Sequence, residues 1–143
     1  MKKTLVLLLV LFSVAIIFAG CAGNDTKTAD EIDVDLTVLS STMVYAEVNN
    51  IMTNPDDYMG KTIKVQGYYN ASYYDVTDNY YHYVIIQDAV DCCAQGIEFI
   101  LTGGDFKYPD DFPEILDFIE ITGVFDNYDE LDKTYYYLNV DLS

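Results

Sequence analysis

Five short segments rich in strand-forming residues constrain the fold of this chain most, and alternation of apolar and polar residues is clear in the first of them. In residues 61–69, Ile63 and Val65 fall on one side of the segment, whereas Thr62 and Lys64 fall on the other. Successive side chains of a β-strand point to opposite faces of a sheet, so this alternation predicts a half-buried strand. The chain is therefore expected to be mostly β. The other predicted strands occupy residues 80–87, 96–101, 118–125 and 134–140.

One α-helix is predicted before these strands, at residues 43–53. Val44, Val48 and Ile51 recur there at helical spacing, and Pro55 follows directly after the pattern. The first and fourth strands each have a glycine within or after them, and the connection between the third and fourth is long enough for a helical turn. These features favour a small, closed, five-stranded barrel, because closure removes exposed sheet edges.

The N-terminal segment is similar to a bacterial lipoprotein signal. A pair of lysines precedes an apolar run at residues 5–19, and an Ala-Gly pair stands directly before Cys21. The run of about 15 residues is shorter than the roughly 20 that a membrane-spanning helix needs. The resemblance implies cleavage before Cys21 and lipidation of its thiol, which would hold the protein on the extracytoplasmic face of the cell membrane. The alternatives are an ordinary cleaved signal with a chance cysteine, or an uncleaved anchor.

A flexible tether is expected between this signal and the predicted barrel. Residues 21–40 are rich in small, polar and acidic residues and show no sustained period. Such a composition buries too little apolar area to offset the conformational entropy that is lost on folding, so the segment is expected to be disordered. The predicted organisation is a signal peptide at residues 1–20, a tether at residues 21–40 and one barrel domain at residues 41–143.

The charge of the chain excludes one class of partner. It has 24 acidic and seven basic residues, with a formal net charge of −17. Nucleic-acid binding needs a cationic surface to contact phosphates, so no nucleic acid is expected as a partner. A surface this acidic keeps the domain soluble, or attracts cations and basic partners. The expected partners are the membrane, through the lipid anchor, and an envelope protein or a small ligand.

Three stretches of the chain resemble uncharacterised small bacterial lipoproteins with an OB-like barrel domain. They are NPDDYMGKTIKVQG at residues 54–67, QDA at residues 87–89 and CCAQGIEF at residues 92–99, the last belonging to a paired-cysteine motif, DCCAQGIEF. The resemblance covers about residues 43–142 and implies an OB-type barrel, but it carries no assigned function. The paired cysteines are also similar to those in soluble domains of some permease-associated proteins, which favours a transport setting.

Cys92 and Cys93 are the candidates for thiol chemistry. If Cys21 is lipidated, two cysteines remain, and in a secreted protein an even number indicates a disulfide. Neighbouring cysteines close a tight ring with unusual peptide geometry, however. The alternatives are two packed thiols, a redox-labile bond, or ligation of a soft metal.

His82, the one histidine, lies within an aromatic strand, where a structural role is the simplest interpretation. The alternative is a metal site in which His82 joins Cys92 or Cys93, and tetrahedral zinc would then need a further ligand. The spacing of these residues matches no established metal signature. No cofactor is therefore expected.

Tyrosine is the dominant aromatic residue, with 14 copies and no tryptophan. Consecutive tyrosines place rings on both faces of a strand, so some of them must point away from the core. Tyr81, Tyr83, Tyr135 and Tyr137 are the candidates for a ligand face that stacks on a sugar, a peptide or a partner protein. Packing between neighbouring strands is the alternative explanation.

No motif in the chain predicts catalysis. The acidic runs lack the EF-hand pattern, and G-x-S-x-G, H-E-x-x-H, P-loop and Rossmann glycine patterns are all missing. The chain is therefore not expected to be an enzyme. We expect a lipid-anchored extracytoplasmic binding or interaction module of the cell envelope, associated with a transport complex. The alternative is a thiol-redox or metal-handling lipoprotein that uses Cys92 and Cys93.

Overall fold

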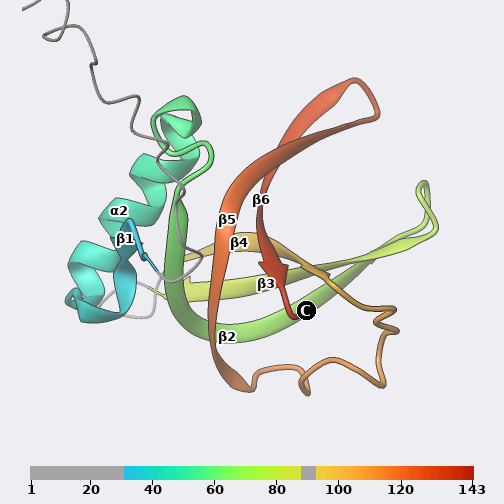
Figure 1. The fold of residues 1–143 in the computed structure, drawn as a ribbon. Coiled ribbons are helices and arrows are strands. Elements are labelled where there is room, and N and C mark those ends of the chain that lie inside the picture. Colours follow the sequence, from blue (N-terminus) through green and yellow to red (C-terminus); the bar gives the residue numbers. More distant parts are fainter. Residues whose placement is uncertain (1–30, 88–92) are drawn as a thin grey trace, which may run out of the picture. The chain divides into compact units, whose positions relative to one another are not determined.

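The computed structural model describes residues 31–87 and 93–143, which form a six-stranded sheet with one α-helix (Figure 1). The helix α2 (Ser41–Thr53) is followed by a short 3-10 helix, η2 (Pro55–Asp57). The strands are β1 (Val34–Asp35), β2 (Thr62–Tyr74), β3 (Asn79–Gln87), β4 (Ala94–Thr102), β5 (Phe118–Glu130) and β6 (Lys133–Asp141). The mostly β class, the single α-helix and the five predicted strands are confirmed, and β2 and β5 are longer than predicted.

The five long strands close into a ring. β2 pairs with β3, β3 with β4, β4 with β6, β6 with β5, and β5 pairs again with β2. All of these pairs are antiparallel except β4–β6, which is parallel. β2 reaches both of its neighbours because it bends, as Figure 1 shows: residues 62–68 pair with β5, and residues 68–74 pair with β3.

Two glycines within the strands make this closure possible. A Cβ atom on Gly67, beside the bend of β2, would lie 2.5 Å from the carbonyl oxygen of Ile85 on β3. A Cβ atom on Gly123 of β5 would lie 2.8 Å from the carbonyl oxygen of Asn139 on β6. Such close approach of two backbones requires a residue without a side chain. These are the two glycines that the sequence places in the first and fourth predicted strands.

The core lies inside the ring of strands, and α2 packs against one side of this ring (Figure 1). Alternate residues of β2 point inward, as the sequence predicts, and Ile63 and Val65 are fully buried. The helix adds Val48 and Ile51, which are also fully buried. Burying one such aliphatic side chain stabilises the fold by about 1.5–3 kcal/mol.

A disordered tether was expected at residues 21–40, and this expectation is wrong for residues 31–40. β1 pairs in parallel with the start of β2, and Leu36, in the 3-10 helix η1 (Leu36–Val38), is only 1% exposed. Asp35 caps this helix, because its carboxylate accepts a hydrogen bond of 2.9 Å from the backbone nitrogen of Thr37. The compact unit therefore spans Glu31–Ser143. The apolar residues here follow no period, so the sequence pattern does not reveal them.

The connection between β4 and β5 contains turns but no helix. One turn is closed by a backbone hydrogen bond of 2.9 Å from Asp111 nitrogen to Lys107 oxygen. The residue after this turn, Phe112, stacks on the ring of His82. Within residues 31–87 and 93–143, no helix has the length and apolar character to cross a membrane. Cys21, Cys92, the expected signal at residues 1–20 and residues 21–30 of the expected tether lie outside the described residues.

Candidate ligand-binding site

A cleft opens on the sheet where β3 and β4 separate. Their ladder runs from the Gln87–Ala94 pair to the His82–Phe99 pair and ends there. Beyond this point β3 continues in its hairpin with β2, whereas β4 continues beside β6. The β2–β3 and β5–β6 hairpins therefore diverge (Figure 1). Their side chains, with those of β4, line two neighbouring cavities.

These cavities have volumes of about 190 Å³ and about 480 Å³. The two cavities share two tyrosines and two glutamates in their lining. Further tyrosines line the smaller one, and Tyr80, His82, Phe99 and Phe112 are among the further residues that line the larger one. We use the name tyrosine–glutamate cleft for Tyr81 and Tyr83 of β3, Glu98 of β4, Tyr128 and Glu130 of β5, and Tyr135 of β6. Strand register explains their proximity, because Tyr83 pairs with Glu98 and Tyr128 pairs with Tyr135.

Each carboxylate of the cleft accepts a hydrogen bond from a tyrosine hydroxyl. Tyr128 Oη donates to Glu98, and it lies 3.0 Å from Oε1 and 3.2 Å from Oε2. Tyr81 Oη donates to Glu130 Oε2 at 2.6 Å. It also lies 2.8 Å from Thr77 Oγ1, and since the phenol has one proton, Thr77 is the donor in that contact. These bonds hold the phenol rings against the carboxylates.

The tyrosine rings of β5 and β6 form an aromatic wall. Tyr128 stacks on Tyr135 with 5.5 Å between ring centroids and 20° between ring planes. Tyr137 meets Tyr128 edge to face, at 5.7 Å and 68°. Offset-stacked and edge-to-face pairs are the favoured arrangements of aromatic rings, so this wall has a defined shape before any ligand arrives.

Glu98 is the most perturbed acid of the cleft. Glu98 is only 7% exposed, and burial raises the pKa of its carboxyl group to about 7, above its ordinary value of 4.5. The negative charge of Glu130 acts in the same direction, whereas the hydrogen bond from Tyr128 acts against it. Among the described residues, no lysine or histidine forms an ion pair with Glu98. The cleft therefore contains a buried acid without a cationic partner.

The tyrosines of this region stay neutral near pH 7. Burial raises the pKa of Tyr81, Tyr83, Tyr128 and Tyr137, and the charge of Glu98 raises all four further. A neutral phenol donates one hydrogen bond and keeps an electron-rich ring face. The cleft thus offers carboxylate oxygens, hydroxyl groups and aromatic faces.

Three of the four tyrosines predicted as a ligand face lie together. Tyr81, Tyr83 and Tyr135 line the smaller cavity. Tyr137 does not line it, but lies behind Tyr128 and pairs with Glu98 in the β4–β6 ladder. The sequence analysis missed the remaining members of the cleft, Glu98, Tyr128 and Glu130. A polar residue between Ile97 and Phe99 was the available signal for Glu98. Tyr128 and Glu130 lie beyond residue 125, where the fourth strand was predicted to end, but β5 extends to Glu130.

His82 points to the other face of β3, toward the core. Its ring stacks on Phe112 with centroids 3.8 Å apart, and Nδ1 lies 2.8 Å from Tyr69 Oη in a hydrogen bond. Burial lowers the pKa of His82 to about 4, so the imidazole is neutral near pH 7. These contacts agree with the structural role that the sequence favours.

The metal site suggested for His82 with Cys93 is not formed. His82 pairs with Phe99, whereas Cys93 is exposed and lies six residues earlier, just before β4 begins. A strand rises about 3.3 Å per residue, so the two side chains are roughly 20 Å apart along the strand. Among the described residues, no group of three or more His, Cys, Asp or Glu side chains is placed to hold a metal ion. The pairing of Cys93 with Cys92 stays a prediction.

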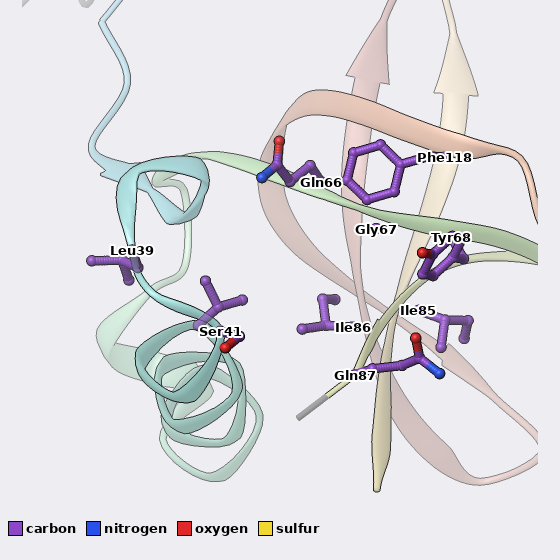
Figure 2. Close-up of a pocket in the computed structure, with 10 residues that line it drawn as sticks. Leu39, Ser41, Gln66, Gly67, Tyr68, Ile85, Ile86, Gln87 and Phe118 are labelled. Carbon is purple, nitrogen blue, oxygen red and sulfur yellow. The ribbon is translucent and has the colours of Figure 1, made fainter. Parts of the chain in front are cut away.

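A second hollow, of about 320 Å³, lies between the start of α2 and strands β2 and β3. Figure 2 shows Leu39 and Ser41 on its helix side, facing Ile86 and Gln87 across the hollow. Its lining is aliphatic, aromatic and amide, and none of its lining residues is charged. It also ends at Gln87, where the described chain is interrupted. The tyrosine–glutamate cleft is therefore the better candidate for a specific site.

The cleft has the general character of a small-molecule site. Such sites are concave, largely apolar or aromatic, and contain a few convergent polar groups that orient the ligand. Of its two cavities, the one of about 190 Å³ is smaller than the roughly 300–1,000 Å³ of sites for drug-sized ligands and suits a smaller group, whereas the one of about 480 Å³ lies within that range. Comparison with protein-family models, curated proteins and solved structures finds no match for this chain.

Proposed function

We propose that this protein is a lipid-anchored, non-catalytic binding module of the cell envelope, and that the tyrosine–glutamate cleft is its ligand site. The observation that carries this proposal is the cleft itself, where five strands bring tyrosine rings and two carboxylates around one cavity. A buried acid such as Glu98 destabilises a fold unless it is paired, so its presence in a cavity favours a functional role.

The strand arrangement supports an OB-like barrel. Numbering only the five long strands, the first pairs with the second and fourth, and the third and fifth are parallel, with β1 as an addition at one edge. OB barrels bind ligands on the face of their second and third strands, between the two hairpin loops that flank it. The cleft occupies that place, on β3 and β4 between the two hairpins. Its carboxylates disfavour nucleic acid as the ligand.

The chemistry of the cleft supports binding rather than catalysis. The neutral tyrosines are weak nucleophiles, and His82, which lines the larger cavity, has its ring stacked on Phe112 and its Nδ1 in a hydrogen bond with Tyr69. A lipid anchor at Cys21 would keep this site close to the bilayer. Cys21 and Glu31 are ten positions apart, which is a reach of at most about 35 Å. A transport complex of the envelope is the setting that we propose.

Metabolic labelling with a fatty-acid probe tests the anchor. We expect the wild-type protein to incorporate the probe and to fractionate with membranes, and Cys21→Ser to do neither, because the acylated thiol is lost. Cys93→Ser is the matched control, since it removes a thiol outside the signal and should leave labelling unchanged. Labelling of the Cys21→Ser protein, or none of the wild type, would overturn the lipid-anchored part of the proposal.

A thermal-shift screen of the purified full-length chain tests the ligand site. We expect at least one class among small amines, sugars and short peptides to raise the melting temperature of the wild type. The same class should have no effect on the double variant Tyr128→Ala/Tyr135→Ala, which removes the stacked wall. A ligand that stabilises both proteins equally would place the site elsewhere on the molecule.

A further inference from the structure

We propose that the ligand of the tyrosine–glutamate cleft is a small organic cation, whose ammonium group is held by Glu98 within the tyrosine rings. This inference rests on the proposed function of the cleft as a ligand site, and it assigns the chemical class of the ligand. Four features carry it: the unpaired buried carboxylate, the second carboxylate nearby, the aromatic walls, and the size of the cavity.

The first feature is the missing counter-charge of Glu98. A glutamate that is only 7% exposed is normally paired with a cation or with several hydrogen-bond donors, and here one phenol serves both carboxylate oxygens of Glu98. None of the described lysines forms an ion pair with Glu98. Lys64 pairs with Glu120 at 2.9 Å, Lys107 with Asp105 at 3.5 Å, Lys61 lies over the ring of Tyr58, and Lys133 pairs with Glu130 in the β5–β6 ladder without an ion pair to Glu98. A bound cation supplies the missing partner.

The second feature is the carboxylate of Glu130, which makes binding of a positively charged group at this place more favourable. Glu130 lines both cavities beside Glu98, and its charge disfavours ionisation of Glu98. An ammonium group between the two acids relieves this repulsion. The strongly acidic chain, at −17, also raises the local concentration of cations and disfavours anions.

The walls of the cleft select an organic cation over a metal ion. Calcium takes six to eight oxygen ligands, whereas the cleft has two carboxylates, and no group of three potential ligands lies among the described residues. The faces of tyrosine rings attract organic cations through their quadrupoles, and they do so best where water is excluded. The smaller of the two cavities, about 190 Å³, suits a compact head group, and the larger one, about 480 Å³, lies beside it and shares Glu98 and Glu130. An ammonium ion satisfies both the rings and the carboxylates.

Isothermal titration calorimetry on the full-length chain in mild detergent at pH 8 tests the proposal. The probes are choline, butylammonium, calcium chloride and 3,3-dimethylbutan-1-ol, which is the neutral carbon isostere of choline. We expect choline or butylammonium to bind with a stoichiometry of one. The isostere should bind at least about tenfold more weakly, because it keeps the shape of choline without its charge. Calcium should not compete.

The variant Glu98→Gln assigns the binding to the cleft. It keeps the shape of the side chain and its ability to accept the bond from Tyr128, but it removes the charge. We expect it to weaken ammonium binding by about tenfold or more. Glu120→Gln, which removes an equal charge from the exposed pair with Lys64, should bind as the wild type does. Because Glu98→Gln relieves a buried charge, it is expected to fold, and circular dichroism verifies this.

Each outcome decides the proposal. Loss of binding in Glu98→Gln but not in Glu120→Gln supports it. Equal binding by the wild type and Glu98→Gln overturns it, as do equal binding of choline and its isostere, preference for calcium, and no binding of either ammonium probe at millimolar concentration. The anchor is tested separately. If the fatty-acid probe labels Cys21 and a sugar or peptide stabilises the cleft while ammonium ions do not bind, the inference fails and the proposed function stands.

Discussion

Two aromatic clusters on opposite faces of β3 and β4 show how one pair of strands produces two different environments. The inner cluster surrounds His82, which contacts Tyr69, Phe99 and Phe112. The outer cluster surrounds Glu98, next to Phe99 in sequence but directed to the other face. Burial acts on both groups and disfavours the charged form of each, so it lowers the pKa of the base and raises that of the acid. The rings of the inner cluster pack on one another, and His82, Phe99 and Phe112 also line the larger cavity, whereas the tyrosines of the outer cluster surround the smaller one.

The largest expected contrast is in stability. Phe99→Ala, in the inner cluster, should lower the free energy of unfolding by about 3–5 kcal/mol, because it leaves a cavity in a closed core. Tyr135→Ala, in the outer cluster, should cost about 1 kcal/mol or less, since its ring is partly exposed and already faces a cavity. Urea denaturation measures both. Equal losses would mean that the outer wall is also part of the core.

The next contrast concerns the charge of Glu98. Its pKa is raised in the folded state, so between about 4.5 and 7 the folded protein holds a proton that the unfolded chain releases, and this group makes stability fall as pH rises through that window. Glu98→Gln should therefore increase the free energy of unfolding by about 2–3 kcal/mol at pH 8. At pH 4 it should change little.

Denaturation curves at both pH values measure this effect, with Glu120→Gln as the control for simple loss of charge. The charged or titratable groups that face Glu98 are Glu130, Tyr81, Tyr83, Tyr128 and Tyr137. An equal gain at pH 4 and pH 8 would show that ionisation of Glu98 is not its source.

His82 should show the opposite pH dependence. Its pKa is lowered to about 4 in the folded state, so the unfolded chain binds the extra proton between pH 6.5 and 4, and stability falls as pH falls through that window. Between pH 7 and pH 5 the loss is about 2 kcal/mol. It is clearest in the Glu98→Gln background, because in the wild type the two groups oppose each other. His82→Phe in that background should flatten the curve. A slope that persists would assign the acid sensitivity to another group.

The affinity for choline should rise with pH as Glu98 becomes ionised. The ammonium group needs the ionised carboxylate, and the fraction ionised rises through a pKa of about 7. The affinity should therefore increase by about tenfold between pH 6 and pH 8, which corresponds to about 1.4 kcal/mol. Calorimetric titration at the two pH values measures it. An unchanged affinity would mean that the ligand does not contact the charge of Glu98.

The smallest contrast compares two hydroxyl groups of the outer cluster. Tyr128→Phe removes the donor to the buried Glu98 and should cost about 1 kcal/mol at pH 8. Tyr81→Phe removes the donor to Glu130, which is more exposed, and should cost about half as much. Thermal unfolding of the two single variants ranks them. The reverse order would indicate that Glu130, rather than Glu98, is the acid that depends on the phenol network.

The candidate site was only partly predictable, because some of its residues lie in segments with a clear strand pattern and others lie in segments with the composition of a turn. Tyr81 and Tyr83 belong to a strand that alternation identifies, and so does Tyr135. Tyr128 and Glu130 lie in a run of acidic and polar residues that is typical of a turn, yet β5 extends through it because β6 offers a complete partner strand. Leu36 shows the same limit: it is buried through β1 and η1, although its neighbours in sequence have the composition of a tether. In both cases contacts with distant residues outweighed the local composition.

Local patterns along the chain were enough to predict the mostly β class, one helix, the approximate bounds of five strands, and tyrosines in positions that face away from the core. These features follow from periodicity, which is a local property of the chain. Three features came only from the folded protein: β2 bends to close the ring, β3 and β4 separate at the His82–Phe99 pair, and Glu98 meets Tyr128 from a strand thirty residues away. Alternation specifies which face a side chain occupies, whereas the choice of partner strand and register depends on contacts between residues far apart in the sequence.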